Sequence, residues 1–164
     1  MRQERFTEQA QEALAASQEL VHQYHHSQWD VEHILLALLQ QESGLVGDIL
    51  RELDVDVESV RREVEAVLEK SPGVAYEVAQ IYATPRIVDL IRRAGDEADR
   101  LKDEFIGAEH LLIAMAGEQK GEATSILHRF GIDQEKVYRA LQKLRGGHRV
   151  TDARAESKYR SLEK

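Results

Sequence analysis

The sequence predicts an all-α fold, built from two tandem four-helix repeats related by pseudo-two-fold symmetry. Aromatic residues make up only 5% of the 164 residues while charged residues reach 32%, a balance that favours helices packed through aliphatic side chains. Apolar residues recur at helical spacing along most of the chain. The segment EHILLA at 32–37 recurs as EHLLIA at 109–114, an offset of 77 residues (110 − 33) that holds without a gap over both copies.

The residues at their N-termini indicate where the first two helices of each repeat begin. Helix one is expected to begin after Thr7 or Thr84, since threonine is a good N-cap, and Pro85 occupies the favoured first helical position in the second copy. Helix two is expected after Asp30 or Gly107. It carries the densest apolar run, ILLALL at 34–39 in the first copy, so it should lie at the centre of its unit.

The last two helices of each repeat follow a glycine. Gly44 and Gly121 break the chain, and a short third helix follows each of them. A fourth helix should open at Asp56 or Asp133, with a valine stripe on one face of the first copy. We therefore predict repeat one at 5–70, a surface-packed linker at 71–83 and repeat two at 84–145, together forming one domain at 1–145.

The segment 146–164 reads as a connector. Gly146 and Gly147 end the last helix, and the polar stretch that follows suggests the start of a capped helix with no core of its own.

Composition excludes several classes of function. The chain has no cysteine, so disulfides and thiolate metal sites are impossible. The N-terminal stretch lacks the apolar core of a signal peptide, and no apolar run approaches the ~18 residues of a membrane span. With 22 basic and 30 acidic residues the net charge is -8, which argues against nucleic-acid and membrane binding. We expect a cytoplasmic protein.

Several motifs together resemble the N-terminal domain of the Clp/Hsp100 AAA+ proteins. They are the two Thr-capped first helices, the two second helices with the pattern E-H-[IL]-L-[LI]-A, and the tail RGGHRVTD at 145–152. The resemblance covers essentially the whole chain. The tail is most similar to the lead into the first ATPase domain of ClpB-type disaggregases. The segment YATPR at 82–86 and the two Glu-His pairs are more similar to the ClpC-type unfoldases, which are our second choice.

This resemblance implies a substrate-binding module that captures unfolded or aggregated proteins, and also adaptor proteins, for an ATP-driven ring. The chain has no G-x-x-x-x-G-K-[ST] motif, so we expect it to be no enzyme and to hold no cofactor or metal. ATP and Mg²⁺ would belong to ATPase domains that follow, and residues 146–164 would lead to them. The isolated domain should be a monomer and the full-length protein a hexamer. A stand-alone helical adaptor and an enzyme are the competing interpretations.

The resemblance also implies site residues, each of which has a plainer structural role. A threonine, a loop acid and a helix-two glutamate of ClpB relatives match Thr7, Asp103 and Glu109. A structural role would explain each of them equally. Thr7 would be a helix N-cap, Asp103 a solvated loop carboxylate, and Glu109 a favourable negative charge at a helix N-terminus. By repeat symmetry we add Glu32 and Thr84, and expect these helix N-termini to be exposed at the surface joining the copies. We expect apolar contacts to the substrate from Leu90, Phe105 or Ile106.

Other positions depart from the family patterns. Arg93, Glu97 and His110 stand where ClpB relatives can have apolar residues that line a groove. In ClpC relatives, glutamates matching Glu32 and Glu109 accept the guanidinium of phosphorylated arginine, but this chain lacks the threonine that precedes them.

The histidines and the single tryptophan favour structural roles. His22 and His26 could share a helix face, yet a third metal ligand at a defined spacing is missing. We expect His33 and His110 to be buried and hydrogen-bonded, and Trp29 to plug the start of helix two.

Overall fold

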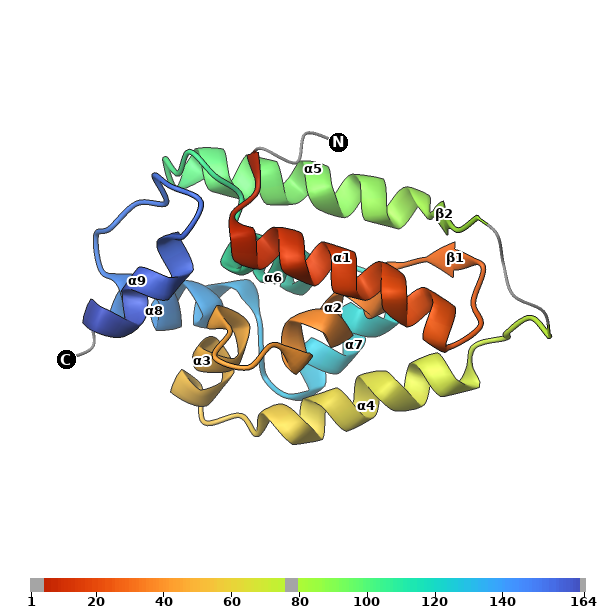
Figure 1. The fold of residues 1–164 in the computed structure, drawn as a ribbon. Helices are drawn as coiled ribbons and strands as arrows, with labels where there is room; N and C mark the ends of the chain where they lie inside the picture. The colour runs from red at the N-terminus through yellow and green to blue at the C-terminus, as the bar shows by residue number, and fades with distance from the viewer. Residues whose placement is uncertain (1–4, 76–79, 163–164) are drawn as a thin grey trace.

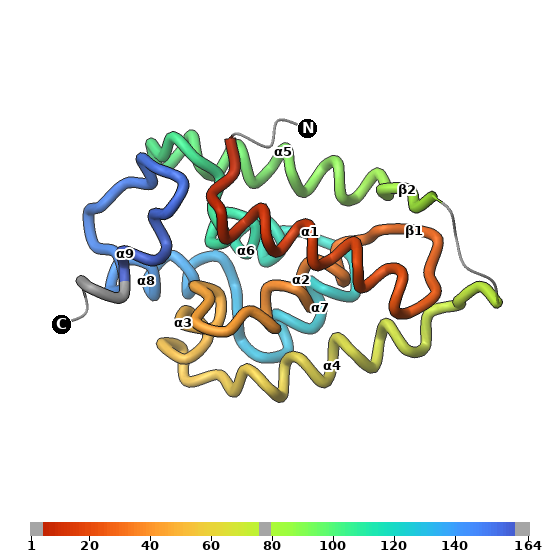
Figure 2. The backbone as a smooth tube through the Cα atoms, in the orientation of Figure 1, coloured from red at the N-terminus to blue at the C-terminus, as the bar shows by residue number. Residues whose placement is uncertain are grey.

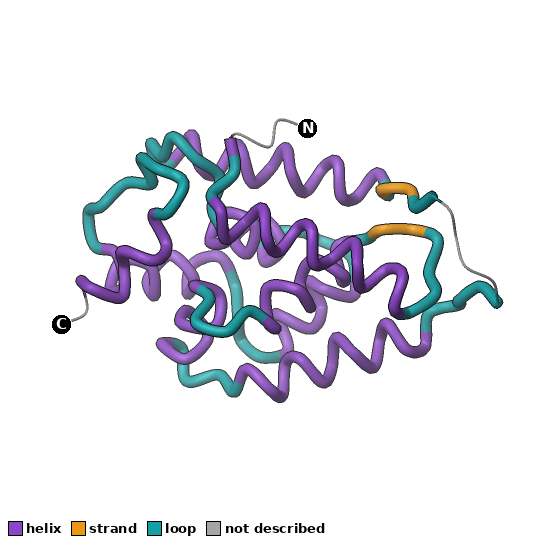
Figure 3. Tube along the Cα trace, viewed as in Figure 1, coloured by secondary structure: helices purple, strands orange, loops and turns teal. Residues whose placement is uncertain are grey.

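The structure is a computed structural model that describes residues 5–75 and 80–162 (Figure 1). Most of the described chain is helical (Figure 3). Residues 76–79 of the predicted linker lie outside the described residues. In chain order the elements are α1 (Glu8–Gln23), β1 (Gln28–Trp29), α2 (Val31–Gln40), α3 (Leu45–Glu52), α4 (Val57–Lys70), β2 (Tyr82–Ala83), α5 (Pro85–Arg100), α6 (Ala108–Ala116), α7 (Glu122–Arg129), α8 (Gln134–Arg145) and α9 (Ala155–Leu162).

The predicted helix starts are confirmed. Thr7 Oγ1 accepts a hydrogen bond from the backbone N–H of Ala10 at 3.1 Å, and Thr84 does the same for Ile87 at 3.3 Å. Asp56 and Asp133 cap α4 and α8 in the same way, and Asp30 caps α2 by accepting from the backbone N–H of Val31 at 2.8 Å. Each of these bonds satisfies a backbone N–H that has no partner inside its helix.

The core is centred on α2 and α6, as the apolar runs predict. Every residue from Val31 to Leu39 and from Ala108 to Ala116 is buried. α1 packs on α2 and α5 packs on α6, so each first helix covers the second helix of its own copy. The copies also interlock, because α3 contacts α6 and α8 while α4 contacts α7. One continuous apolar core results.

Two short backbone pairings join the copies reciprocally, and the sequence analysis did not anticipate them. β1 pairs with β2 in parallel, with Trp29 opposite Ala83, and Phe6 forms an isolated parallel bridge to Ile106 (Figure 3). The offset of 77 places Phe6 on Ala83 and Trp29 on Ile106 (83 − 6 and 106 − 29), so the two pairings are equivalent. In each copy, the residue that precedes the N-cap threonine of the first helix thus pairs with the other copy. Such reciprocal pairing is what two-fold symmetry between the copies predicts.

Trp29 fills the start of α2 as predicted. Its ring is buried, and its Nε1–H donates to Ser17 Oγ at 2.8 Å, so the one polar atom of the indole is satisfied.

The C-terminal segment, predicted to be a connector with no core of its own, packs on the domain. The chain after α8 turns back toward the start of α1 and the end of α5 before α9 begins (Figure 2). Val150, Ala155, Glu156 and Tyr159 are all buried. Backbone bonds run from Glu8 N to Ala153 O at 2.7 Å and from Glu104 N to Val150 O at 2.8 Å. The segment is held by apolar burial and by bonds to the domain.

Candidate functional site

The N-terminal ends of α1 and α6 lie together and share one carboxylate. Glu156 Oε2, at the start of α9, accepts a hydrogen bond from Thr7 Oγ1 at 2.7 Å and one from the backbone N–H of Ala108 at 3.0 Å. Glu156 is only 4% exposed and Thr7 is fully buried. The partial positive charge of the helix N-termini and these two hydrogen bonds favour the ionised carboxylate, whereas its burial opposes ionisation. α9 therefore covers the place where the two copies present these N-termini.

A buried arginine ties the same region to α8. The Arg145 guanidinium donates to both carboxylate oxygens of Asp103, at 2.9 and 3.2 Å, and to Glu109 Oε2 at 3.0 Å. Asp103 also accepts from the backbone N–H of Val150 at 2.9 Å and lies 2.7 Å from His110 Nε2. A buried charge pair holds only when its remaining donors and acceptors are satisfied, and Asp103 meets this condition.

Charge and burial shift the pKa values of this cluster in opposite directions. Burial raises the pKa of Glu156 to about 7, and the nearby charge of Glu109 adds to this effect. Burial opposes ionisation of Asp103 too, but hydrogen bonds from His110 and Val150 and the charge of Arg145 hold its pKa below the ordinary value. One oxygen of Glu109 and one of Glu156 are buried without a hydrogen-bond partner within the described chain.

The first copy repeats this arrangement in a more open form. Glu32, the counterpart of Glu109, receives Arg86, whose Nη2 lies 3.3 Å from Glu32 Oε2. Arg86 Nη1 lies 3.5 Å from Asp30, and Asp30 also accepts from Thr84 Oγ1 at 3.1 Å. Burial and Asp30 raise the pKa of Glu32, against the lowering effect of Arg86. A cleft of about 180 Å³ borders Glu32. At the equivalent place in the second copy, beside Glu109, Arg145 and α9 occupy the space.

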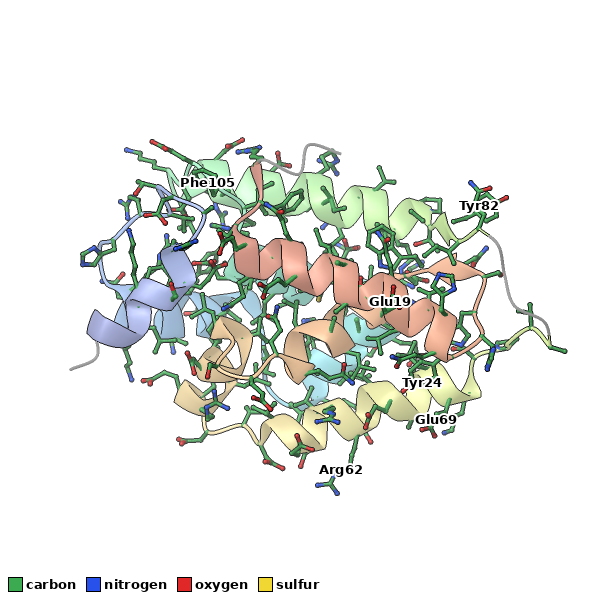
Figure 4. The ribbon with its side chains drawn as sticks, viewed as in Figure 1. Glu19, Tyr24, Arg62, Glu69, Tyr82 and Phe105 are labelled. Carbon is green, nitrogen blue, oxygen red and sulfur yellow. The ribbon has the colours of Figure 1, made fainter. Side chains whose placement is uncertain are left out.

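The predicted site residues fall into two groups. Glu32 and Thr84 border the open arrangement, and the side chain of Phe105 is half-buried at the opposite end of α5 from Tyr82 (Figure 4). The expected exposure of the other N-termini is wrong, because α9 and the core cover these residues. Five predicted residues are buried in this way, namely Thr7, Leu90, Asp103, Ile106 and Glu109, and Glu32 is buried as well, although it borders the cleft. Their contact with a substrate stays a prediction.

Arg145 and Glu156 are the functional candidates that the sequence analysis missed. In the 77-residue repeat, Arg145 is equivalent to Leu68, which lies on the apolar stripe of α4. A charged residue at a position that is apolar in the other copy was therefore the signal that the sequence offered. No comparable signal marks Glu156, because the predicted repeats end before it.

An apolar groove of about 320 Å³ lies between the N-terminal segment and α5. Phe6 comes from the first copy, whereas Ile91, Gly95 and Ile106 come from the second. A Cβ at Gly95 would lie 3.3 Å from Arg5 Nη1 and 3.6 Å from Ile106 Cδ1, so glycine leaves room for this approach. Arg5 pairs with Asp99 at 2.5 Å across one edge of the groove.

The other side of α5 is polar. Arg93 pairs with Asp89 at 2.9 Å and with Glu118 at 3.6 Å. Glu97 pairs with Arg100 at 3.2 Å and accepts a hydrogen bond from Tyr138. The predicted departures at Arg93 and Glu97 thus replace an apolar lining with ion pairs, and the apolar groove lies along Ile91 and Gly95 instead.

The sequence also predicts that the chain has neither a metal site nor a membrane-spanning helix. Within residues 5–75 and 80–162, no three histidine or acidic residues gather in a metal-binding arrangement. In the same part of the chain, no helix has both the length and the apolar character needed to cross a bilayer.

Comparison with known proteins agrees with this architecture. The family model of the Clp repeat (R) N-terminal domain matches residues 5–130. The chaperone protein ClpB of Bacillus cereus is 36% identical over 161 residues, which are 96% of this chain and 18% of that protein. The chain thus spans less than a fifth of the length of such relatives.

Solved structures show the same fold. The Hsp104 N-terminal domain from Candida albicans superposes with a TM-score of 0.81 at 20% identity, covering 92% of this chain and 98% of that one. A ClpV N-domain in complex with a VipB peptide has a TM-score of 0.66 at 17% identity, covering 84% and 85%. The double repeat, the interlocked core and these matches together establish that the chain belongs to the Clp repeat N-terminal domain family and is similar to the N-domains of ClpB chaperones.

Proposed function

We propose that this domain captures unfolded or aggregated proteins for a ClpB-type disaggregase that works as a hexameric, ATP- and Mg²⁺-dependent ring in the cytoplasm. The observation that carries the proposal is the apolar groove of Phe6, Ile91, Gly95 and Ile106, which joins the two copies. A shallow groove with charged edges suits weak binding of many extended segments that expose apolar side chains. A related ClpV N-domain has been solved with a peptide, which supports peptide binding by this fold.

The covered residues would take part only after α9 leaves. Thr7, Asp103 and Glu109 are bonded within the chain, with Glu156 holding the N-termini of α1 and α6. Release of α9 would free the Thr7 hydroxyl and the Ala108 N–H for a peptide carbonyl or carboxylate. Thr84 and Phe105, which are partly exposed, would extend the client surface, and a client would reach the buried Glu32 through the cleft that it borders.

Titration with a permanently unfolded, reduced and alkylated protein tests the groove. Ile91→Asp places a charge in the groove and should weaken binding at least fivefold. Val88→Asp is the matched control, because Val88 lies on the same helix and is 64% exposed outside the groove. It should bind within twofold of the wild type. Equal binding by both variants would contradict client capture in the groove.

A second candidate function is a ClpC-like module that binds adaptors or arginine-phosphorylated clients. Glu32 already accepts a guanidinium from Arg86, and Arg86 is half-exposed beside an open cleft. Carboxylates hold guanidinium groups well, so a client arginine could replace Arg86. Arg86→Ala should then strengthen binding of a phosphoarginine peptide, followed by calorimetry, and Glu32→Ala should abolish it. No binding by Arg86→Ala, or unchanged binding by Glu32→Ala, would exclude this candidate.

A further inference from the structure

A second apolar hollow lies away from the groove, between the end of α3 and one face of α8. It has a volume of about 540 Å³, and its apolar lining includes Leu53, Val55 and Phe130. All three side chains are partly buried against the core, so each is fixed in place yet still faces solvent. In Figure 1, α3 lies on the lower side of the molecule, whereas α5 forms the upper edge. The hollow is therefore separate from the proposed client groove.

The edge of this hollow is basic in a chain whose net charge is -8. Lys136, Arg139 and Lys143 line it from α8. The Arg139 and Lys143 side chains are 71% and 72% exposed, and they pair with Glu135 at 2.6 Å and Glu52 at 3.5 Å. Exposed pairs of this kind are weak and can be exchanged for other carboxylates.

Lys136 reaches toward the hollow without an acidic partner. No ion pair of its side chain is found among the described residues, and a Cβ at Gly131 would lie 3.3 Å from its Nζ. Gly131 has a φ of +76°, which also favours glycine at this turn. The ammonium group therefore lies over the turn that follows α7, next to Phe130.

The repeat provides an internal comparison for this basic edge. The offset of 77 relates Lys136, Arg139 and Lys143 to Ser59, Arg62 and Ala66 of α4. The first copy thus folds into the same four helices with one cation where the second copy has three. The fold does not require the basic edge, so it is a surface property of the second copy alone.

We propose that this hollow docks a segment of a partner protein that carries a bulky apolar side chain between aspartates or glutamates. The apolar side chain would contact Leu53, Val55 and Phe130, and the carboxylates would meet Lys136, Arg139 and Lys143. The net charge of -8 disfavours binding of an acidic segment to the chain in general, whereas three cations gather at this edge. The proposal is independent of client capture, because it uses neither the groove nor the residues under α9.

The test uses a fluorescent twelve-residue peptide with one central phenylalanine and leucine pair flanked by aspartates and glutamates, titrated into the full chain. Binding should be in the high micromolar range and weaken roughly tenfold between 50 and 300 mM salt, since the contacts are ionic. Replacing the apolar pair by serines should weaken it at least fivefold. Amide shifts in NMR spectra should map to the end of α3, to the turn at Phe130 and Gly131, and to α8 from Lys136 to Lys143.

Arg139→Glu and Arg62→Glu form a matched pair of variants, because they make the same charge change at equivalent positions of the two copies. Arg139→Glu should weaken binding at least fivefold, and Arg62→Glu should bind within twofold of the wild type. Fluorescence of Trp29 and circular dichroism verify that both are folded. Equal loss in both variants, or shifts that map elsewhere, would overturn the proposal. So would full competition by single-stranded DNA of equal charge, which would show that any polyanion binds.

Discussion

At the scale of single residues, the equivalent glutamates Glu32 and Glu109 show how the burial of an ion pair determines its effect on stability. Glu109 and its partner Arg145 are almost completely buried, whereas Glu32 is paired with an Arg86 side chain that is 42% exposed. A buried charge left without its partner is strongly destabilising, but an exposed pair contributes little. Equivalent positions therefore have different energetic roles in the two copies.

Arg145→Ala should lower the free energy of unfolding by about 3–5 kcal/mol, because it leaves Asp103 and Glu109 buried and without their cation. Arg86→Ala should lower it by less than about 1 kcal/mol, since the Arg86 guanidinium is half-exposed. Urea denaturation followed by the fluorescence of Trp29, the single tryptophan, measures both values. Equal effects of the two substitutions would contradict this account of the buried cluster.

At the scale of elements, α9 contributes one buried carboxylate, Glu156, whose ionisation depends on the docked state. The pKa of Glu156 is raised from 4.5 to about 7 in the folded chain, so the folded state binds more protons than the unfolded state between these values. The stability that this group contributes is complete below pH 4.5 and is lost as the pH rises through about 7. Docking of α9 should be tightest in mildly acidic solution.

Glu156→Gln mimics the protonated side chain and should remove this pH dependence. Relative to Glu156→Gln, the wild type should lose roughly 3 kcal/mol of stability between pH 4.5 and pH 8, from the size of the pKa shift. Asp152→Asn is a control in the same segment, because Asp152 is partly exposed and pairs with Lys158, not with the N-termini of α1 and α6. Parallel pH profiles for the wild type and Glu156→Gln would contradict the assignment.

His33 gives the molecule a separate sensitivity to acid. Burial, and then the neighbouring His26, lower the pKa of His33 to about 4, so the folded state keeps the ring neutral where the unfolded chain binds a proton. Stability from this group is complete above pH 6.5 and is lost as the pH falls toward 4. The ring lies in a chain of hydrogen bonds, with 2.9 Å from His26 Nδ1 to His33 Nε2 and 3.0 Å from Asp30 N to His33 Nδ1.

His33→Gln should flatten the acid limb of the stability profile, because glutamine does not titrate. Measured by urea denaturation at pH 4.5, 5.5 and 7, the variant should lose less stability toward pH 4.5 than the wild type does. His22→Gln, which changes an exposed histidine of α1, is the control and should leave the profile unchanged. A profile for His33→Gln as steep as that of the wild type would show that another group governs the acid limb.

At the scale of the whole molecule, the two copies form one cooperative body. The core is continuous, α3 and α4 of the first copy pack on helices of the second, and the reciprocal pairings Trp29 to Ala83 and Phe6 to Ile106 tie the copies together. Neither copy buries its apolar surface alone. Independent unfolding of the halves is therefore disfavoured.

Urea unfolding should follow a single transition when Trp29 fluorescence reports the first copy and circular dichroism reports all helices. A tryptophan placed in the second copy by Phe130→Trp should give the same midpoint within about 0.2 M. Phe130 is only partly buried, so the larger ring can be accommodated. Two separate midpoints would show that the copies unfold independently.

The sequence predicts the local features of this fold well and the long-range polar contacts poorly. Helix starts follow from Thr7, Asp56 and Asp133, because a cap bonds to a residue only three positions away. The reciprocal strand pairs involve too few residues to leave a periodic pattern. The cover over Thr7 depends on Glu156, which is 149 residues away in the chain, and no local pattern encodes such a contact. The sequence therefore predicts where these helices begin but not the burial of the residues at their N-termini.

The reciprocal pairing has the form of a contact between two identical subunits. Residue 6 meets residue 106 as residue 83 meets residue 29, which is how the interface of a symmetric homodimer is built. In a dimer of separate single-repeat chains, such contacts would form only above the concentration set by their affinity. Joining the copies in one chain replaces that concentration by an effective one in the millimolar range. The domain can therefore keep its paired state at any dilution.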